Sequence, residues 1–175
     1  MKSRILAILL TLTMIVGLGV STFAAVITID PNKPDGYTGE DPTYTYYVMM
    51  KASVGTGDKV SYFVETEALA TALDGLKVGE DDLFTVTKAG DIWNVVINKK
   101  SDDSAFTGIE VAAALQTIKD KAIATDDAAD DNTITLAYDA YVLIESSLGK
   151  LLIVDTYTTN KSEKEGSADG ETRLP

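Results

Sequence analysis

Short stretches in which apolar and polar residues alternate make up most of the chain after residue 25. A period of two is typical of a half-buried β-strand, and turn residues between neighbouring stretches indicate antiparallel hairpins. The longest stretch, residues 44–54, has two predicted faces: Tyr46, Val48 and Met50 on one side, and Tyr47, Met49 and Lys51 on the other. The predicted strands are residues 26–29, 44–54, 59–65, 83–88, 92–99, 133–138, 141–146 and 151–156.

Two segments have apolar residues at helical spacing instead. The first, residues 66–73, follows Thr66 as a predicted N-cap and stops at Gly75. The second, residues 107–124, begins with Thr107 and Glu110 at the spacing of a capping box. Its predicted apolar stripe consists of Val111, Leu115, Ile118 and Ala122.

Hairpins interrupted by only two helices are typical of an antiparallel β-sandwich and not of a parallel α/β sheet. We therefore predict one mainly-β sandwich domain over residues 25–159. Trp93, Val95 and Ile97 share one face of a strand, and we predict that this face points into the core. Residues 160–175 carry no periodic apolar signal and are predicted to form a flexible tail.

A different pattern precedes these elements. Lys2 and Arg4 are followed by an uncharged, mostly aliphatic run over residues 5–20 and by small residues up to Ala24. This order predicts a secretory signal peptide over residues 1–24. The run is shorter than the ~20 residues that span a bilayer. We therefore expect an exported protein with no membrane span after cleavage, secreted or held at the cell surface.

Composition excludes several classes of chemistry. The chain has no Cys and no His, which removes disulfides, thiolate nucleophiles, imidazole bases and the usual zinc ligands. Its 15 basic and 27 acidic residues give a formal charge of −12, which opposes binding to nucleic acid. We predict no enzymatic activity, no cofactor and no metal. A hydrolase that relies on carboxylates alone has no motif in its favour.

Three stretches of the domain have the motifs of a known family. Residues 43–52 are similar to a strand of the form T-Y-T-x-Y-K-hydrophobic-hydrophobic-D-A, and residues 57–62 are similar to the hairpin strand that follows it. Residues 138–149 resemble a closing hairpin of the form G-Y-Y-hydrophobic-hydrophobic-x-S-S-x-G. In order and spacing they resemble the N-terminal domain of Gram-positive, isopeptide-forming fimbrial (pilin) subunits. Val48 and the pair Asp139-Ala140 depart from the family's lysine and glycine-tyrosine.

The resemblance implies an Ig-like sandwich and a structural or adhesive role in a fimbrium or at the cell wall. Other surface or pilus proteins are the implied partners, together with a sortase that would join them. Two forms remain open, namely a subunit truncated before its LPxTG segment and a stand-alone secreted relative. The alternative function is a free secreted β-sandwich module that binds a glycan or the host matrix.

An internal Lys–Asn crosslink would make such a domain rigid without cysteine. The reaction needs a buried neutral amine, a neighbouring carboxamide and a protonated carboxyl group. The candidate residues are Lys51, Asn94, Asn98 and Glu145. In the opposing interpretation Lys51 reaches solvent at a strand edge, and both asparagines lie on the exposed face opposite Trp93.

Three further groups of residues have a functional and a plain interpretation. Lys161 and Lys164 are candidate intersubunit lysines, although a solvated tail is favoured. The acidic segment 126–132 carries calcium-type ligands without the spacing of a calcium loop, so a soluble loop is favoured. Four tyrosines could form a carbohydrate platform or pack in the core, and core packing is favoured: Tyr44, Tyr46, Tyr47 and Tyr62.

Overall fold

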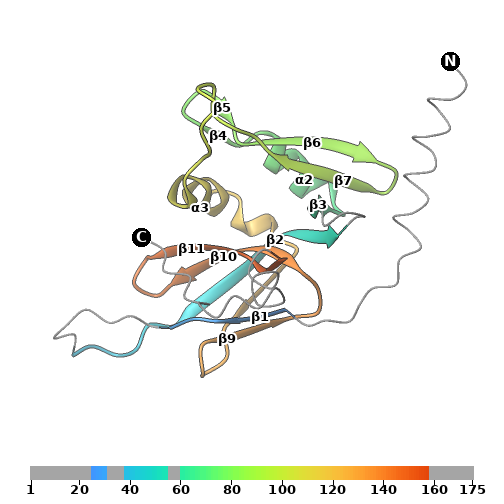
Figure 1. Cartoon of the computed structure of the whole chain (residues 1–175). Helices are drawn as coiled ribbons and strands as arrows, with labels where there is room; N and C mark the ends of the chain where they lie inside the picture. The colour runs from blue at the N-terminus through green and yellow to red at the C-terminus, as the bar shows by residue number, and fades with distance from the viewer. Residues whose placement is uncertain (1–24, 31–37, 55–59, 158–175) are drawn as a thin grey trace, which may run out of the picture.

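The computed structural model describes residues 25–30, 38–54 and 60–157, so the predicted signal peptide (1–24) and tail (160–175) lie outside the described residues. The described chain is mainly β, with antiparallel sheets and two α-helices (Figure 1). Its strands are β1 (Ala25–Thr28), β2 (Tyr44–Val54), β3 (Val60–Val64), β4 (Lys77–Val78), β5 (Asp81–Asp82), β6 (Phe84–Ala89), β7 (Ile92–Ile97), β8 (Ala124–Asp127), β9 (Thr133–Leu136), β10 (Ala140–Ser146) and β11 (Leu151–Asp155). Its helices are α2 (Glu67–Asp74), α3 (Gly108–Gln116) and the short 3-10 helix η1 (Lys119–Lys121). None of these helices is long and apolar enough to cross a membrane.

The main sheet is built around the long strand β2. Seven strands belong to it, in the order β11-β10-β2-β3-β7-β6, with β8 as an additional partner of β2. Strand β10 pairs with one edge of β2, while β8 and then β3 share the other edge. The predicted hairpins β2–β3, β6–β7 and β10–β11 are all present. Gly90 and Gly149 adopt φ values of +66° and +74° in the last two turns, a conformation that glycine adopts without strain.

Apolar side chains pack on both faces of this sheet. The helix-side core lies under α2 and α3 and consists of Met49, Met50, Val64, Leu69, Ala70, Leu73, Leu76, Leu83, Phe84, Val95, Val111, Ala112, Leu115, Tyr141 and Leu143. The ribbon-side core lies under the two-stranded ribbon β1–β9 and consists of Ala25, Ile27, Ile29, Tyr44, Val48, Ile134, Leu136, Ala140, Val142 and Ile144. The ribbon and the helices thus cover opposite faces of the sheet (Figure 1).

The strict alternation predicted for β2 is wrong at Met49. Along β10 the partners Val142 and Tyr141 are consecutive, whereas on β2 they face Val48 and Met50, so Met49 is an extra residue in a β-bulge. The bulge places Met49 and Met50 in the same helix-side core. After it the faces are exchanged, because Lys51 pairs with Ala140 of the ribbon-side core.

The helices begin where their predicted caps stand. Thr107 and Glu110 form the complete capping box of α3, and Val111 and Leu115 are buried. The predicted stripe continued to Ala122, but α3 ends at Gln116, and the chain proceeds through η1. Thr66 caps α2 by position, and its side chain makes no capping hydrogen bond.

Three short strands carry no apolar alternation and were not predicted. The short pair β4–β5 closes the turn between α2 and β6, with Lys77 opposite Asp82. The polar strand β8 pairs with β2, with Thr45 opposite Asp127. All four residues of β8 are exposed, so the strand contributes no side chain to a core. Its backbone hydrogen bonds to β2 hold it in the sheet.

The start of β1 and the end of β11 lie at the same end of the domain, beside the connection from β9 to β10. Ala25 at the start of β1 pairs with Leu136, and Thr156 after β11 accepts a hydrogen bond from the N–H of Ala140 at 2.9 Å. Only the short segment from Leu136 to Ala140 separates these two anchor points. The opposite end carries the β10–β11 turn, where the N–H of Ser147 donates to the carbonyl of Thr43.

Candidate functional site

Lys51 lies at the surface of the sheet and is paired. Its Nζ is 2.7 Å from the Glu65 carboxylate and 4.9 Å from the centre of the Tyr138 ring. The side chain keeps 21% of its surface exposed. A charged ammonium with a carboxylate partner is a poor nucleophile, because the crosslinking reaction requires the neutral amine.

The two candidate asparagines do not contact Lys51. Asn94 is two strands away in the sheet: it pairs with Phe63, and Phe63 pairs with Lys51, which places their backbones about 10 Å apart. Asn98 is held elsewhere. Its Nδ2 donates to the carbonyl of Asp82 at 3.1 Å, and its Oδ1 accepts from Thr85 at 3.0 Å.

Glu145 lies on the opposite face of the sheet from Lys51. It accepts hydrogen bonds from Gln116 of α3 at 3.0 Å, from Lys119 of η1 and, at 3.5 Å, from the Tyr47 hydroxyl. The hydrogen bond from Lys119 is the main reason why the pKa of Glu145 is lowered. Along β10, Glu145 is five residues from Ala140, the partner of Lys51, which corresponds to about 17 Å.

The residues suggested for an internal crosslink are therefore not gathered into one site. The bulge at Met49 places Lys51 and Glu145 on opposite faces. The strand register separates the rest, because Asn94 lies two strands from Lys51. The candidate intersubunit lysines Lys161 and Lys164 lie outside the described residues. The four tyrosines of the suggested carbohydrate platform are divided between the two cores, with Tyr47 and Tyr62 on the helix side and Tyr44 and Tyr46 on the ribbon side.

A shallow polar depression of about 330 Å³ adjoins Glu145 at the turn end of β10. Its lining consists of Thr43, Thr45, Glu145, Ser146, Ser147 and Gly149. Its hydroxyl groups already serve the fold: Ser147 Oγ accepts from the N–H of Thr43 at 3.1 Å, and Thr45 Oγ1 donates to Asp127 at 2.7 Å. These hydrogen bonds hold the turn at Ser147 and the start of β2 in place.

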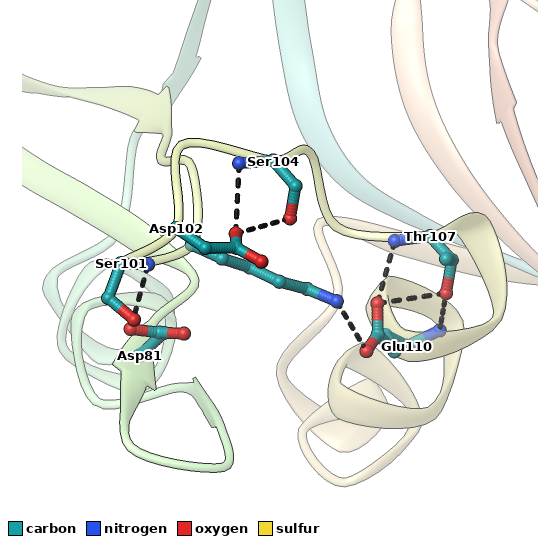
Figure 2. Close-up of polar contacts among 7 residues, drawn as sticks. Asp81, Ser101, Asp102, Ser104, Thr107 and Glu110 are labelled. Carbon is teal, nitrogen blue, oxygen red and sulfur yellow. Dashed lines mark hydrogen bonds and ion pairs between the residues drawn. The ribbon is translucent and has the colours of Figure 1, made fainter.

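A second polar cluster ties the connection between β7 and α3 (Figure 2). The Glu110 carboxylate accepts from Lys100 at 2.8 Å and from the N–H and hydroxyl of Thr107 at 2.8 and 2.9 Å. The hydrogen bond from Lys100 is the largest cause, and together with the hydrogen bonds from Thr107 it lowers the pKa of Glu110 to about 2. Asp81 and Asp102 accept from the backbone of the same loop, through Ser101 and Ser104. Each of the three carboxylates accepts a hydrogen bond from this loop. The cluster therefore stabilises the conformation of the connection between β7 and α3.

A second depression, of about 230 Å³, lies between α2 and the β6–β7 hairpin. We call it the Trp93 depression, and its lining consists of Glu67, Ala70, Thr71, Asp74, Val86, Lys88 and Trp93. Trp93 packs against the helix-side core, as its strand pattern predicted, and yet it is only half-buried. The Nζ of Lys88 lies 4.9 Å from the centre of a Trp93 ring, so the face of the indole borders a polar space.

The sequence indicated the strand that carries Trp93 and gave no reason to connect it with Glu67 or Thr71. Those residues come from α2, and only the packing of α2 on β6 brings them to the indole. One signal was present: a hairpin around Gly90 with Lys88 opposite Trp93 puts a cation beside the only tryptophan. In the part of the chain that the structure describes, no group of three acidic side chains is placed to hold a metal ion.

Comparison with known proteins gives no relative to compare these sites with. No protein-family model matches the chain, and neither a curated protein sequence nor a solved structure shows significant similarity to it.

Proposed function

We propose that this chain is an exported, non-enzymatic structural or adhesive protein of the cell surface. In this proposal residues 1–24 are a cleaved signal peptide, and the following domain is an Ig-like sandwich comparable to the N-terminal domain of a Gram-positive pilus subunit. Other surface proteins are its partners. Two observations support this proposal: the basic start and apolar run of residues 1–24, and the antiparallel, mainly-β domain that follows them.

One structural observation carries the proposal. The start of β1 and the end of β11 lie at the same end of the domain, beside the segment from Leu136 to Ala140. A domain that is held from one end leaves its opposite end, which carries the β10–β11 turn, free to meet another molecule. This arrangement suits a domain displayed on a surface, because contacts at the far end do not compete with its attachment.

Export and display can be tested together. The full chain, with a C-terminal epitope tag, is produced in a Gram-positive host, and cytoplasm, cell wall and medium are analysed separately. We expect a mature N-terminus at Ala25 by mass spectrometry and a tag that antibodies reach on intact cells. The matched control Leu9→Arg places a charge in the apolar run and should be retained with residues 1–24 attached. A wild-type chain that stays in the cytoplasm uncleaved would refute the proposal.

The same fractions separate the two forms of the function. High-mass species in the wall fraction that disappear in the double variant Lys161→Arg, Lys164→Arg would assign these lysines to intersubunit joining. Recovery of the mature chain from the medium alone would favour the second candidate, a free secreted module that binds a glycan or the host matrix. The Trp93 depression is the observation in favour of that candidate.

A further inference from the structure

We propose that the Trp93 depression binds one pyranose ring of a neutral glycan. This inference names a ligand class for the adhesive role, and its biological meaning therefore rests on the proposed function. The depression combines an aromatic surface, a hydrogen-bond acceptor and a hydrogen-bond donor in a space of about 230 Å³. Pockets for drug-sized ligands begin near ~300 Å³, so this smaller space suits a single sugar ring.

The aromatic surface is the indole of Trp93 on β7. It is the only tryptophan of the chain, and it lies at the border of the helix-side core and not inside it. The ring carries partial negative charge on its faces, which attracts positively polarised groups. The ammonium of Lys88 already occupies such a position at 4.9 Å. The polarised C–H groups on one side of a pyranose ring are attracted by the same field and can stack on the indole.

The polar groups of the depression complement sugar hydroxyls. Glu67 offers a carboxylate and Lys88 an ammonium, and neither makes a hydrogen bond or ion pair with another residue in the described ranges. Both side chains are exposed, so within the described part of the chain a sugar hydroxyl has no hydrogen bond or ion pair to displace at either residue. A hydroxyl group donates to a carboxylate and accepts from an ammonium, so one ring can satisfy both residues.

The rim also contains a group whose position is fixed. Asp74 at the end of α2 accepts a hydrogen bond from the N–H of Val86 at 3.2 Å, which ties the helix to the outer strand β6. This contact covers a backbone group on the edge strand and holds the wall of the depression in place. A site whose walls are fixed before binding loses less conformational entropy when the ligand arrives.

The charge of the lining selects against acidic sugars. Glu67 and Asp74 contribute two negative charges against one positive charge from Lys88, and the whole chain has a formal charge of −12. A uronic or sialic acid would therefore be repelled. A cationic peptide would be attracted by the same charges, and it is the competing ligand that the experiment must distinguish.

The only tryptophan makes binding directly observable. We would titrate the purified chain with neutral methyl pyranosides, N-acetylglucosamine oligomers, sialyllactose and a lysine-rich peptide, and follow the fluorescence of Trp93. We expect a saturable change with at least one neutral saccharide and none with sialyllactose. Overturning results are no change with any neutral saccharide, or saturation only with the peptide.

Variants separate the depression from the rest of the surface. Binding measured by calorimetry should weaken at least tenfold in Glu67→Gln, whereas Glu80→Gln, an exposed carboxylate in the β4–β5 turn, should bind as the wild type does. Equal binding by both variants would overturn the inference. If the chain is displayed on cells and binds no sugar, this inference fails alone. If the purified chain binds sugar and is never exported, the proposed function fails instead.

Discussion

The two helix N-caps of this domain allow a controlled test of what a capping hydrogen bond contributes. Thr107 precedes α3 and Thr66 precedes α2, and both are exposed threonines in an extended backbone conformation. Only Thr107 uses its side chain, because its Oγ1 accepts from the N–H of Glu110 at 3.3 Å. Thr107→Ala and Thr66→Ala therefore remove the same atoms from equivalent positions. Only Thr107→Ala also removes a capping hydrogen bond.

The expected magnitudes follow from these contacts. Replacing an N-cap threonine by alanine costs ~0.5–2 kcal/mol when the cap bond exists. In Thr107→Ala the Glu110 carboxylate keeps its bonds from Lys100 and from the N–H of residue 107 (Figure 2), so half of the capping box survives. We therefore expect a loss of about 1 kcal/mol for Thr107→Ala. Thr66→Ala loses no bond, and an exposed substitution of that kind changes stability by less than about 0.5 kcal/mol.

Urea unfolding followed by far-ultraviolet circular dichroism and by Trp93 fluorescence measures both losses. Coincident transitions with unchanged slopes would allow the midpoints to be converted into free energies of unfolding. Equal losses in the two variants, or a larger loss for Thr66→Ala, would refute the argument that the side-chain bond distinguishes these caps. A change of slope in Thr107→Ala alone would show instead that α3 unfolds separately from the sheet.

Three other outcomes can be measured on the same protein. Leu143→Ala removes a fully buried side chain of the helix-side core and should cost ~2–5 kcal/mol, whereas Leu148→Ala, 55% exposed in a turn, should cost less than ~0.5 kcal/mol in the same urea assay. The pKa of Glu110 is lowered from 4.5 to about 2, so the ionised carboxylate stabilises the fold fully above pH 4.5 and this stabilisation is lost as pH falls toward 2. In Glu110→Gln the free energy of unfolding should therefore depend less on pH between 4.5 and 2. Burial raises the pKa of Tyr141 from 10.0 to about 12, so its contribution is complete below pH 10 and is lost as pH rises toward 12; Tyr141→Phe should reduce the alkaline loss of stability and remove one late step from the phenolate absorbance titration.

Strands and hairpins were predictable here because their signals are local. Alternation with a period of two indicated β2 from Tyr44 to Val54, and the structure confirms these bounds. Turn glycines fixed the hairpins around Gly90 and Gly149, where a positive φ is required. Thr107 and Glu110 marked the start of α3 in the same way, since a capping box is complete within four consecutive residues.

Features that depend on partners distant in sequence were not predictable. The bulge at Met49 exists because two consecutive residues of β10 face Val48 and Met50 of β2, and no local pattern in residues 44–54 records this register. Strand β8 is polar along its length and is held by β2, so it lacks the apolar alternation that marks a strand. The same limit applies to the suggested crosslink: residue type and strand position suggest its members, and neither records that the bulge exchanges the faces of β2 after Met49.

Trp93 illustrates why a strand pattern can give the correct face and still miss a site. Its alternation with Val95 indicated the core side, and the structure confirms that Trp93 packs against the helix-side core. A large side chain at the border of a core has a second surface, however, and what meets that surface depends on the helix packed beside it. Since the same indole supports the core and lines the depression, replacing it would change stability and binding together. Glu67 is an exposed residue in the first turn of α2 that lines the depression, so a loss of affinity in Glu67→Gln with unchanged stability can be attributed to the site.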